Sequence, residues 1–252
     1  MKIVVAIKQV PARDSFLKVD ASGAWIEDED LSWEINEPDA YALEAGLQLR
    51  ESAGGEVAVL CAGPDRATQT IREALAKGAD RAIHIEYGNA ADPLALAQAM
   101  AKALESENPD VVLTGLQSDD LGYGQTGVIL AEVLGFAHAT LVMSIETAGD
   151  GIRVKRELED GWFQHVEMPL PALLTIQSGA AKLRYATLMG IKKAKSKEIR
   201  LVDAPAASGN PSVRLEKIYL PQKSKRSQLL EGTPQEVAAQ LVDKLRFEAR
   251  VL

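Results

Sequence analysis

The 252-residue chain contains a single cysteine, Cys61, and few aromatic side chains. One cysteine excludes a disulfide within the chain and a cysteine-rich metal site. An aromatic content of 5% argues against recognition of nucleic-acid bases by stacking. The formal net charge of −8 also argues against nucleic acid, whose phosphates attract basic proteins. We therefore expect neither a metal ion nor a nucleic acid as the ligand.

Long apolar runs are lacking as well, and none approaches the length that spans a bilayer. The first run, from Lys2 to Ile7, is followed by Lys8 and is too short for the core of a signal peptide. These absences predict a cytoplasmic protein without membrane insertion. Apolar residues make up 46% and charged residues 25%, which is typical of a globular protein. The length suits one large domain, or a domain with an appendage.

Familiar catalytic motifs are also missing. The chain has no G-x-x-x-x-G-K-[ST] loop for phosphoryl transfer and no G-x-S-x-G nucleophile elbow. Cys61 has no recognisable base beside it in the sequence. The three histidines, His84, His138 and His165, are far apart and lie on or beside predicted strands, where histidines are usually structural. The sequence therefore predicts no catalytic residue.

The first half of the chain alternates between short apolar runs and segments of helical periodicity. A small hairpin is predicted over residues 16–26, around a Ser22-Gly23 turn. Buried strands are predicted over 2–7, 56–61, 82–85 and 111–114, and helices over 38–53, 65–77, 92–104 and from about 125. This order predicts an α/β fold of Rossmann-like type, with a mostly parallel sheet.

The second half of the chain has a different residue pattern. Three extended segments, 139–146, 152–158 and 162–168, are joined by glycine turns and predict an antiparallel meander, and strand 172–176 is expected to rejoin the sheet. Residues 182–200 carry seven basic side chains and one acid, which predicts a mobile basic segment. A linker at 204–211, an extended stretch at 213–220, a basic patch at 222–226 and a capped helix from Thr233 to about Phe247 follow. We predict a nucleotide-binding domain over 1–200 and a C-terminal linker and arm over 201–252.

The stretch 110–135 joins a buried strand, a polar loop and a helix. Gly122, Gly124 and Gly127 spell G-x-G-x-x-G, which is the spacing of a dinucleotide fingerprint. That fingerprint belongs immediately after its strand, whereas about six residues here separate Gly115 from Gly122. The loop is therefore interpreted as a broader phosphate cradle at a helix N-terminus.

This cradle offers donors for one phosphate group. They are the backbone N–H groups of Gly124, Gln125 and Thr126, and the side chains of the last two. Asp119 and Asp120 are expected to order the loop, or to contact a ribose hydroxyl, because no further ligand cluster accompanies them. A nucleotide that has no nucleophile or base beside it is expected to be structural or regulatory.

Two further segments lie where an open α/β sheet binds its ligand. Residues 62–64 (Ala-Gly-Pro) follow the carboxyl end of a predicted strand. Residues 36–39 (Asn-Glu-Pro-Asp) supply a cap candidate, a first-turn proline and early carboxylates. A plain helix start and a ligand contact both remain open for this second segment.

Four blocks of sequence resemble the β subunit of electron transfer flavoproteins. They are K-I-V-V-A-I-K-Q-V at 2–10, A-G-P-D-R-A-T-Q-T-I-R-E-A-L-A-K-G-A-D-R-A at 62–82, G-L-Q-S-D-D-L-G-Y-G-Q-T-G at 115–127 and R-Y-A-T-L-M-G-I-K-K-A-K at 184–195. The resemblance covers nearly the whole chain. The last block and Gln125-Thr126-Gly127 are its most specific parts.

The resemblance implies an electron carrier rather than an enzyme. The chain would pair with an α subunit that holds the redox-active FAD, and would itself hold a structural AMP. Electrons would come from flavin dehydrogenases, such as acyl-CoA dehydrogenases, and pass to a membrane quinone oxidoreductase. The implied nucleotide contacts are Ala6, Asn36, Glu37, Pro38, Asp39, Ala62, Gly115, Leu116, Gln117, Ser118, Asp119, Asp120, Leu121, Gly122, Tyr123, Gly124, Gln125 and Thr126.

The resemblance also implies a recognition loop at about 176–198 that docks partner dehydrogenases. Leu188 would be its apolar anchor, surrounded by Arg184, Tyr185, Lys192 and Lys193. An apolar centre with charges around it suits a transient docking site, because the charges speed encounter. The linker and the isolated C-terminal helix suggest an arm that packs on the partner subunit, and an arm that folds back on its own domain remains an open alternative.

Two alternatives remain beside this interpretation. A bifurcating branch of the family carries a second FAD in the same β site and uses NADH. Its loop usually reads Q-V-G where this chain has Gln125-Thr126-Gly127, and a threonine hydroxyl suits the terminal phosphate of AMP. The other alternative is a stand-alone adenine-nucleotide-binding regulator. The family is also usually richer in Asp, Asn and Thr at residues 121–124, so contacts there are expected from the backbone.

Overall fold

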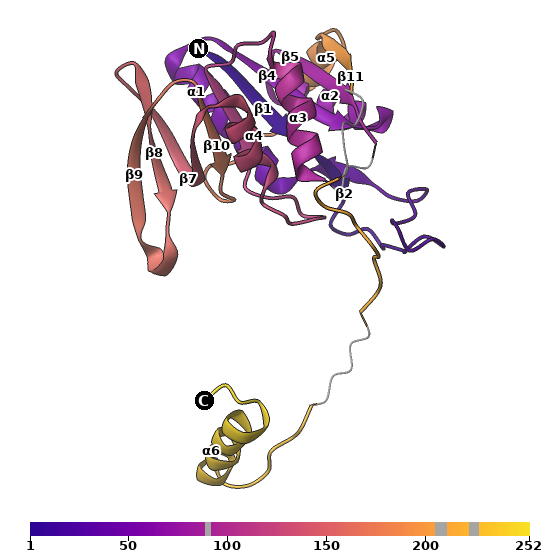
Figure 1. Cartoon of the computed structure of the whole chain (residues 1–252), viewed down its shortest axis with the longest axis vertical. Coiled ribbons are helices and arrows are strands. Elements are labelled where there is room, and N and C mark those ends of the chain that lie inside the picture. The colour runs from indigo at the N-terminus through magenta and orange to yellow at the C-terminus, as the bar shows by residue number, and fades with distance from the viewer. Residues whose placement is uncertain (89–91, 205–210, 222–226) are drawn as a thin grey trace. The chain divides into compact units, whose positions relative to one another are not determined.

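The computed structural model describes residues 1–88, 92–204, 211–221 and 227–252 (Figure 1). They form two compact units, Met1–Ile218 and Tyr219–Leu252, which are considered separately. The strands of the first unit are β1 (Lys2–Ile7), β2 (Gln9–Pro11), β3 (Trp33–Ile35), β4 (Glu56–Gly63), β5 (Arg81–Glu86), β6 (Val111–Gly115), β7 (Ala137–Ala148), β8 (Gly151–Glu157), β9 (Phe163–Pro169), β10 (Ala172–Ile176) and β11 (Ile199–Asp203). Its helices are α1 (Glu37–Ala53), α2 (Thr68–Lys77), α3 (Pro93–Leu104), α4 (Thr126–Leu134) and α5 (Leu188–Ala194), with 3₁₀ turns at Asp65–Ala67 and Glu159–Gly161.

One nine-stranded sheet organises the described part of this unit, in the order β11-β5-β4-β1-β6-β10-β7-β8-β9. Neighbouring strands from β11 to β7 run parallel, and β8 and β9 complete the sheet as an antiparallel meander. The central strand β1 buries Ile3, Val4 and Val5 completely. A run of β-branched residues suits this position because both faces of a central parallel strand are covered.

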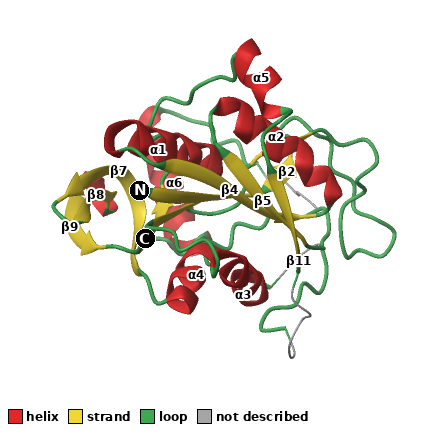
Figure 2. Ribbon diagram, turned by 90° about the horizontal axis from the view of Figure 1, so that it is seen from above, coloured by secondary structure: helices red, strands yellow, loops and turns green. Residues whose placement is uncertain are grey.

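The helices cover both faces of the sheet (Figure 2). Helices α1 and α2 contribute to one hydrophobic core, and α3 and α4 contribute to the other. From β1 the chain moves outward through β4 to β5, then crosses back through α3 to β6 on the opposite side of β1. The strand order therefore reverses between β1 and β6. In open α/β sheets, ligands bind outside the carboxyl ends of the strands at such a point.

The structure confirms the α/β fold and most of the elements predicted from the pattern. The four predicted parallel strands, their helices and the antiparallel meander are all present. The strand predicted at 172–176 rejoins the sheet as β10, beside β6. Gly135 ends α4 with a φ of 68°, a left-handed conformation that favours glycine.

The hairpin predicted over 16–26 is reduced to one bridge, between Val19 and Ile26. The turn itself forms, because Asp20 accepts hydrogen bonds from the backbone N–H and the hydroxyl of Ser22. The apolar residues Phe16 and Leu17 before the turn are exposed, so the start of the segment does not pack against the domain as a strand. The two-stranded sheet of this region instead pairs β2 with β3.

The basic segment 182–200, predicted to be mobile, contains an ordered helix and the start of a strand. Helix α5 packs beside α2, and β11 pairs in parallel with β5 at the edge of the sheet. Strand β11 runs to Asp203 and so continues past the domain boundary predicted at residue 200. The charge pattern was a poor guide to order because Arg184 pairs with acids of α1, and Lys197 and Arg200 bind backbone carbonyls.

The C-terminal unit contains α6 (Pro234–Asp243), followed by a π-helical turn over Lys244–Glu248. Its predicted start is confirmed as a capping box, in which Thr233 and Glu236 each accept the backbone N–H of the other. The extended stretch at 213–220 forms no described strand. The linker predicted at 204–211, except for its end residues, and the basic patch at 222–226 lie outside the described residues. No helix in the described ranges is long and apolar enough to cross a membrane.

Candidate functional site

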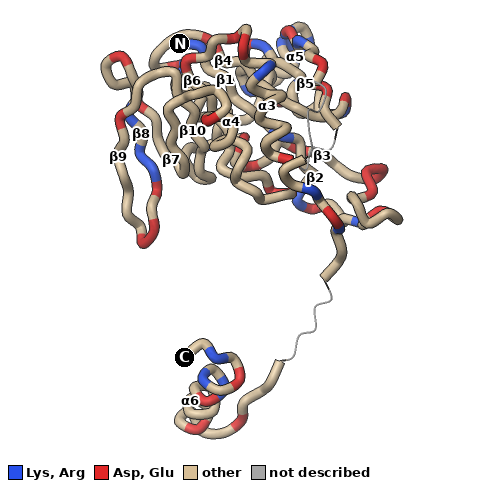
Figure 3. The backbone as a smooth tube through the Cα atoms, in the orientation of Figure 1, with Lys and Arg blue, Asp and Glu red and all other residues tan. Residues whose placement is uncertain are grey.

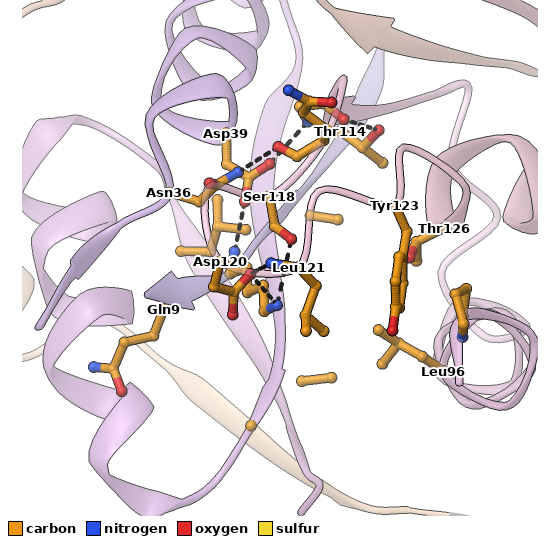
Figure 4. A pocket seen from close by; sticks show the side chains of 18 of the residues that line it. Gln9, Asn36, Asp39, Leu96, Thr114, Ser118, Asp120, Leu121, Tyr123 and Thr126 are labelled. Carbon is orange, nitrogen blue, oxygen red and sulfur yellow. Dashed lines mark hydrogen bonds and ion pairs between the residues drawn. The ribbon is translucent and has the colours of Figure 1, made fainter. Parts of the chain in front are cut away.

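A cavity of about 170 Å³ lies at the carboxyl ends of β1, β4 and β6, where the strand order reverses. Each strand brings its last residues: Ala6 and Ile7 from β1, Gly63 from β4, and Thr114 and Gly115 from β6. The loop between β6 and α4 covers it, with Ser118, Asp120 and Leu121 near the strands and Tyr123 and Thr126 toward α3 (Figure 4). The structure therefore has a cavity at the place where the strand order predicts a ligand.

The structure brings most of the predicted nucleotide residues together around this cavity. Those that line it are Ala6, Asn36, Asp39, Ala62, Gly115, Leu116, Gln117, Ser118, Asp120, Leu121, Tyr123, Gly124, Gln125 and Thr126. Glu37, Pro38, Asp119 and Gly122 are not part of the lining. The residues that do line the cavity come from four separate chain segments that the fold assembles at one edge of the sheet.

Asp39 ties together the two strands on either side of the reversal. Its Oδ2 accepts the backbone N–H of Lys8 at 2.7 Å, and its Oδ1 accepts the backbone N–H of Gly115 at 2.9 Å. The approach is close, since a Cβ on Gly115 would lie 2.4 Å from Asp39 Oδ1. The carboxylate therefore holds the floor of the cavity in shape.

Burial dominates the ionisation of Asp39 and raises its pKa from 3.8 to about 7, although the N–H donors from Lys8 and Gly115 oppose the shift. A carboxyl group whose pKa is higher in the folded chain favours folding most when it is protonated. Its contribution is complete below the unfolded pKa, near pH 4, and is lost as the pH rises through about 7.

We therefore expect the unfolding free energy of the wild type, relative to Asp39→Asn, to fall as the pH rises from about 4 to 7. The pKa difference corresponds to roughly 4 kcal/mol at most. Urea unfolding of both chains at a series of pH values measures this difference. A difference that stays constant, or rises with pH, would contradict the assignment.

The remaining acids and amides of the site order the loop between β6 and α4. Asn36 donates to the backbone oxygen of Gln117 at 2.9 Å and accepts the N–H of Asp119 at 2.8 Å. Asp120 forms an ion pair with Lys8, with 2.6 Å between Oδ1 and Nζ. Asp120 thus contacts Lys8 through its carboxylate, whereas the bond of Asp119 to Asn36 uses its backbone N–H. The described residues contain no group of side chains that could hold a metal ion.

Helix α4 begins at the far end of the cavity with Thr126, and Gln125 is its N-cap. The N–H groups of a first helical turn have no acceptor within the helix and carry the positive end of its dipole. Gly122 and Gly124 adopt left-handed φ values of 64° and 62°, which shape the loop before the helix. The arrangement presents a set of backbone donors to an anion in the cavity.

Gly127 seats this helix directly on the strand ends. A Cβ at this position would lie 2.6 Å from Thr114 Oγ1 and 2.8 Å from Thr175 Cγ2. The third glycine of a dinucleotide fingerprint has the same task of close packing between helix and sheet. Gly127 therefore allows the N-terminus of α4 to lie close to the strand ends, although the loop before it is too long for that fingerprint.

Several lining residues were missed by sequence reasoning, among them Lys8, Gln9, Trp25, Trp33 and Arg66. The Arg66 guanidinium lies 3.7 Å from the ring centroid of Trp33 and donates to Gln9 Oε1 at 3.1 Å. Lys8 directly follows a strand end, so the same rule that selected residue 62 could have found it. Trp33 and Arg66 meet only through the pairing of β2 with β3, for which the local sequence gives no signal.

One lining residue, Trp25, has a buried polar atom. Its indole N–H has no acceptor among the residues that the structure describes. Because this N–H has almost no accessible surface, it does not face the open space of the cavity. The N-terminus of α4 is therefore the part of the lining that suits an anionic group.

The reactive side chains noted in the sequence lie away from the cavity lining. Cys61 is buried in the core, and burial raises the pKa of its thiol to about 12. His84 is buried as well, with Nε2 3.0 Å from the backbone oxygen of Gly63. A thiol with so high a pKa is protonated at neutral pH and is a poor nucleophile.

The predicted docking residues surround α5. Leu188 is 81% exposed and Tyr185 92% exposed, and the neighbouring Met189 and Ile191, which were not predicted, are exposed too. These four residues are called the α5 patch below. Figure 3 shows Lys and Arg segments on the same helix. A cluster of exposed apolar side chains of this kind marks an interaction surface.

Arg184, also predicted for docking, is turned into the domain. Its guanidinium forms ion pairs with Glu44 (Nε to Oε2, 2.8 Å) and Glu51 (Nη1 to Oε1, 2.7 Å) of α1. Although burial raises the pKa of Glu44, the hydrogen bonds and charge of Arg184 hold it below its usual value. Arg184 therefore anchors the residues that precede α5 to helix α1.

Comparison with known proteins gives consistent matches. A model of the electron transfer flavoprotein domain matches residues 24–207. Electron transfer flavoprotein subunit beta of Methylophilus methylotrophus is 36% identical over 256 residues, covering 96% of this chain and 97% of that protein. The protein of that name from Bacillus subtilis (strain 168) is 33% identical over 235 residues, covering 90% and 91%. The acryloyl-CoA reductase electron transfer subunit gamma of Anaerotignum propionicum is 33% identical over 264 residues, covering 97% and 98%.

Proposed function

The chain belongs to the electron transfer flavoprotein family as a β subunit, and from this premise we propose that it carries electrons between flavin dehydrogenases and a membrane quinone oxidoreductase. The FAD that carries the electrons is held mainly by the α subunit of a heterodimer. The relative named as the electron transfer subunit of an acryloyl-CoA reductase supports a dehydrogenase that acts on a CoA thioester. The chain itself contributes a nucleotide site and a docking surface.

The nucleotide that we propose for this chain is AMP. The observation that carries this proposal is the cavity at the strand-order reversal, closed by the N-terminus of α4. One helix N-terminus with Gln125 and Thr126 suits one phosphate group, and the Thr126 hydroxyl adds a donor for a terminal phosphate. The nucleotide would stabilise the loop between β6 and α4 and take no part in electron transfer.

The C-terminal arm is proposed to pack on the α subunit. Helix α6 has no buried residue in the described chain, and Leu241, Val242 and Phe247 expose apolar side chains. Amphipathic helices bury such a face when they fold against a partner. Association of the α subunit with chains that end at residue 218 or 252 tests this assignment.

The carrier function is tested with the purified heterodimer. We expect a short-chain acyl-CoA dehydrogenase and butyryl-CoA to reduce its flavin, and NADH alone to leave the flavin oxidised. The flavin absorbance, followed under anaerobic conditions, measures both reactions. Rapid reduction by NADH would instead favour the bifurcating alternative. Failure of butyryl-CoA and the dehydrogenase to reduce the flavin would contradict the proposed donor class.

A further inference from the structure

Helix α5 presents the α5 patch to solvent but buries very little itself. It has seven residues, and Ala194 is the only one of them that is buried. An isolated helix of this length is unstable in water, and most helices in proteins are stabilised by an apolar face packed on the core. Something other than hydrophobic burial must therefore hold α5 in place.

Two basic side chains bind the carboxyl ends of α2 and α5 reciprocally. Arg72 of α2 donates from Nη1 to the backbone oxygens of Ala194, at 2.6 Å, and Lys197, at 2.7 Å. Lys197, just beyond α5, donates from Nζ to the backbone oxygen of Leu75 at 3.0 Å and to that of Ala79. We call these contacts the Arg72–Lys197 clamp.

The clamp uses the polar groups that a short helix leaves unsatisfied. The last carbonyls of a helix have no donor within it and carry the negative end of the helix dipole, so a cation there is stabilising. The C-terminal end of α5 receives the Arg72 cation from α2. The C-terminal end of α2 receives the Lys197 cation from the segment that follows α5. The contacts therefore fix α5 relative to α2 at the C-terminal ends of both.

Two further contacts leave α5 little room to move. A Cβ on Gly190 would lie 2.3 Å from the backbone oxygen of Ala76, so the helix backbone lies directly against α2. Before the helix, Arg184 is fastened to α1 by its ion pairs with Glu44 and Glu51. The α5 patch is thus carried by a segment that is anchored before, within and after the helix.

We propose that Arg72 and Lys197 are positioning residues that hold the α5 patch in the orientation in which a flavin dehydrogenase binds it. This inference rests on the docking role in the proposed function and adds to it residues that do not contact the dehydrogenase. A preorganised patch binds more tightly because less conformational freedom is lost on association. Loss of the clamp should therefore weaken docking and leave the flavin chemistry intact.

The variants that test the clamp are Arg72→Met and Lys197→Met, which keep the apolar stem and remove the donors. Lys102→Met is the matched control, because Lys102 is an exposed lysine of α3 outside the recognition loop and makes none of the clamp contacts. Arg72→Lys retains a cation and donors at the same place and should restore part of the effect. Leu188→Ala reports on the patch itself.

The measurement uses the complete heterodimer as the electron acceptor of a short-chain acyl-CoA dehydrogenase reduced by butyryl-CoA. We expect each clamp variant to raise the KM for the heterodimer about fivefold to tenfold, with kcat and flavin content within twofold of the wild type. Amide exchange of residues 190–195 should become at least tenfold faster. Lys102→Met should change KM less than twofold, and Arg72→Lys should be intermediate.

The possible failures point to different errors. If Leu188→Ala raises KM and the clamp variants do not, the clamp proposal is wrong and the docking role stands. If neither Leu188→Ala nor the clamp variants change the KM, both the docking role and the clamp proposal are wrong. The same holds if the reduced dehydrogenase does not reduce the flavin of the wild-type heterodimer. A raised KM without faster exchange in α5 would assign the effect to lost charge and overturn the positioning role.

Discussion

Replacing Gly127 by alanine should remove the nucleotide from the purified heterodimer. The new methyl group would lie 2.6 Å from Thr114 Oγ1 and 2.8 Å from Thr175 Cγ2, so α4 must shift away from β6 and β10. Overpacking of this kind costs about 1–3 kcal/mol. Because the shift moves the first-turn N–H groups, we expect the affinity for AMP to fall at least tenfold, roughly 1.4 kcal/mol of binding, and the AMP content of the purified heterodimer to fall with it. Chromatography of the denatured protein measures it.

Gly88→Ala provides the matched control for this substitution. Gly88 also lines the cavity, but nothing lies within 4 Å of a Cβ added there. We expect this variant to keep its nucleotide. Equal AMP contents in the Gly127→Ala variant and the wild type would show that the N-terminus of α4 does not hold the phosphate.

Replacing Leu188 by alanine should slow electron transfer from the dehydrogenase at least tenfold at low heterodimer concentration. The side chain is 81% exposed in the free chain and is available to a partner. Burial of a leucine side chain is worth about 1.5–3 kcal/mol, which corresponds to a factor of ten or more in affinity. Stopped-flow reduction of the flavin measures the rate, and the flavin and AMP contents should remain unchanged.

Leu201→Ala is the control for the loss of an exposed leucine. Leu201 is 60% exposed, and it lies on the edge strand β11 and not in the α5 patch. Its replacement should leave the rate within twofold of the wild type. Loss of flavin from the Leu188→Ala variant, or equal effects of the two substitutions, would contradict a docking role for the α5 patch.

The parts of the fold that could be predicted are those set by local pattern. The run of β-branched residues at 3–5 marks a strand buried on both faces, and this strand lies in the middle of the parallel part of the sheet. The Thr233 capping box and the left-handed Gly135 follow from the chemistry of single turns. In each case one short segment contains the whole physical reason.

The parts that could not be predicted depend on partners far along the chain. The basic segment before residue 200 looks mobile by charge, yet Arg72 and Lys197 use their charges on backbone carbonyls of neighbouring helices. In the same way, Asp39 could be read as a simple first-turn carboxylate. Its bonds to the N–H groups of Lys8 and Gly115 exist only because two strands end side by side. Sequence spacing does not reveal either contact.

The Gly122-Gly124-Gly127 triplet combines a feature that the sequence predicts with one that it does not. Its distance from the preceding strand is confirmed, because β6 ends at Gly115 and α4 begins only at Thr126. The close packing of Gly127 on Thr114 and Thr175 nevertheless gives it the task of that fingerprint's last glycine. A longer loop therefore precedes a helix that is seated in the same way.

The central claim is that this chain holds a structural AMP beside a flavin carried by its partner. The most direct test is to co-purify the chain with its α subunit, denature the complex, and count the released nucleotides by chromatography and mass spectrometry. The account predicts one FAD and one AMP for each heterodimer. Two FAD molecules without AMP, or ATP in place of AMP, would contradict it.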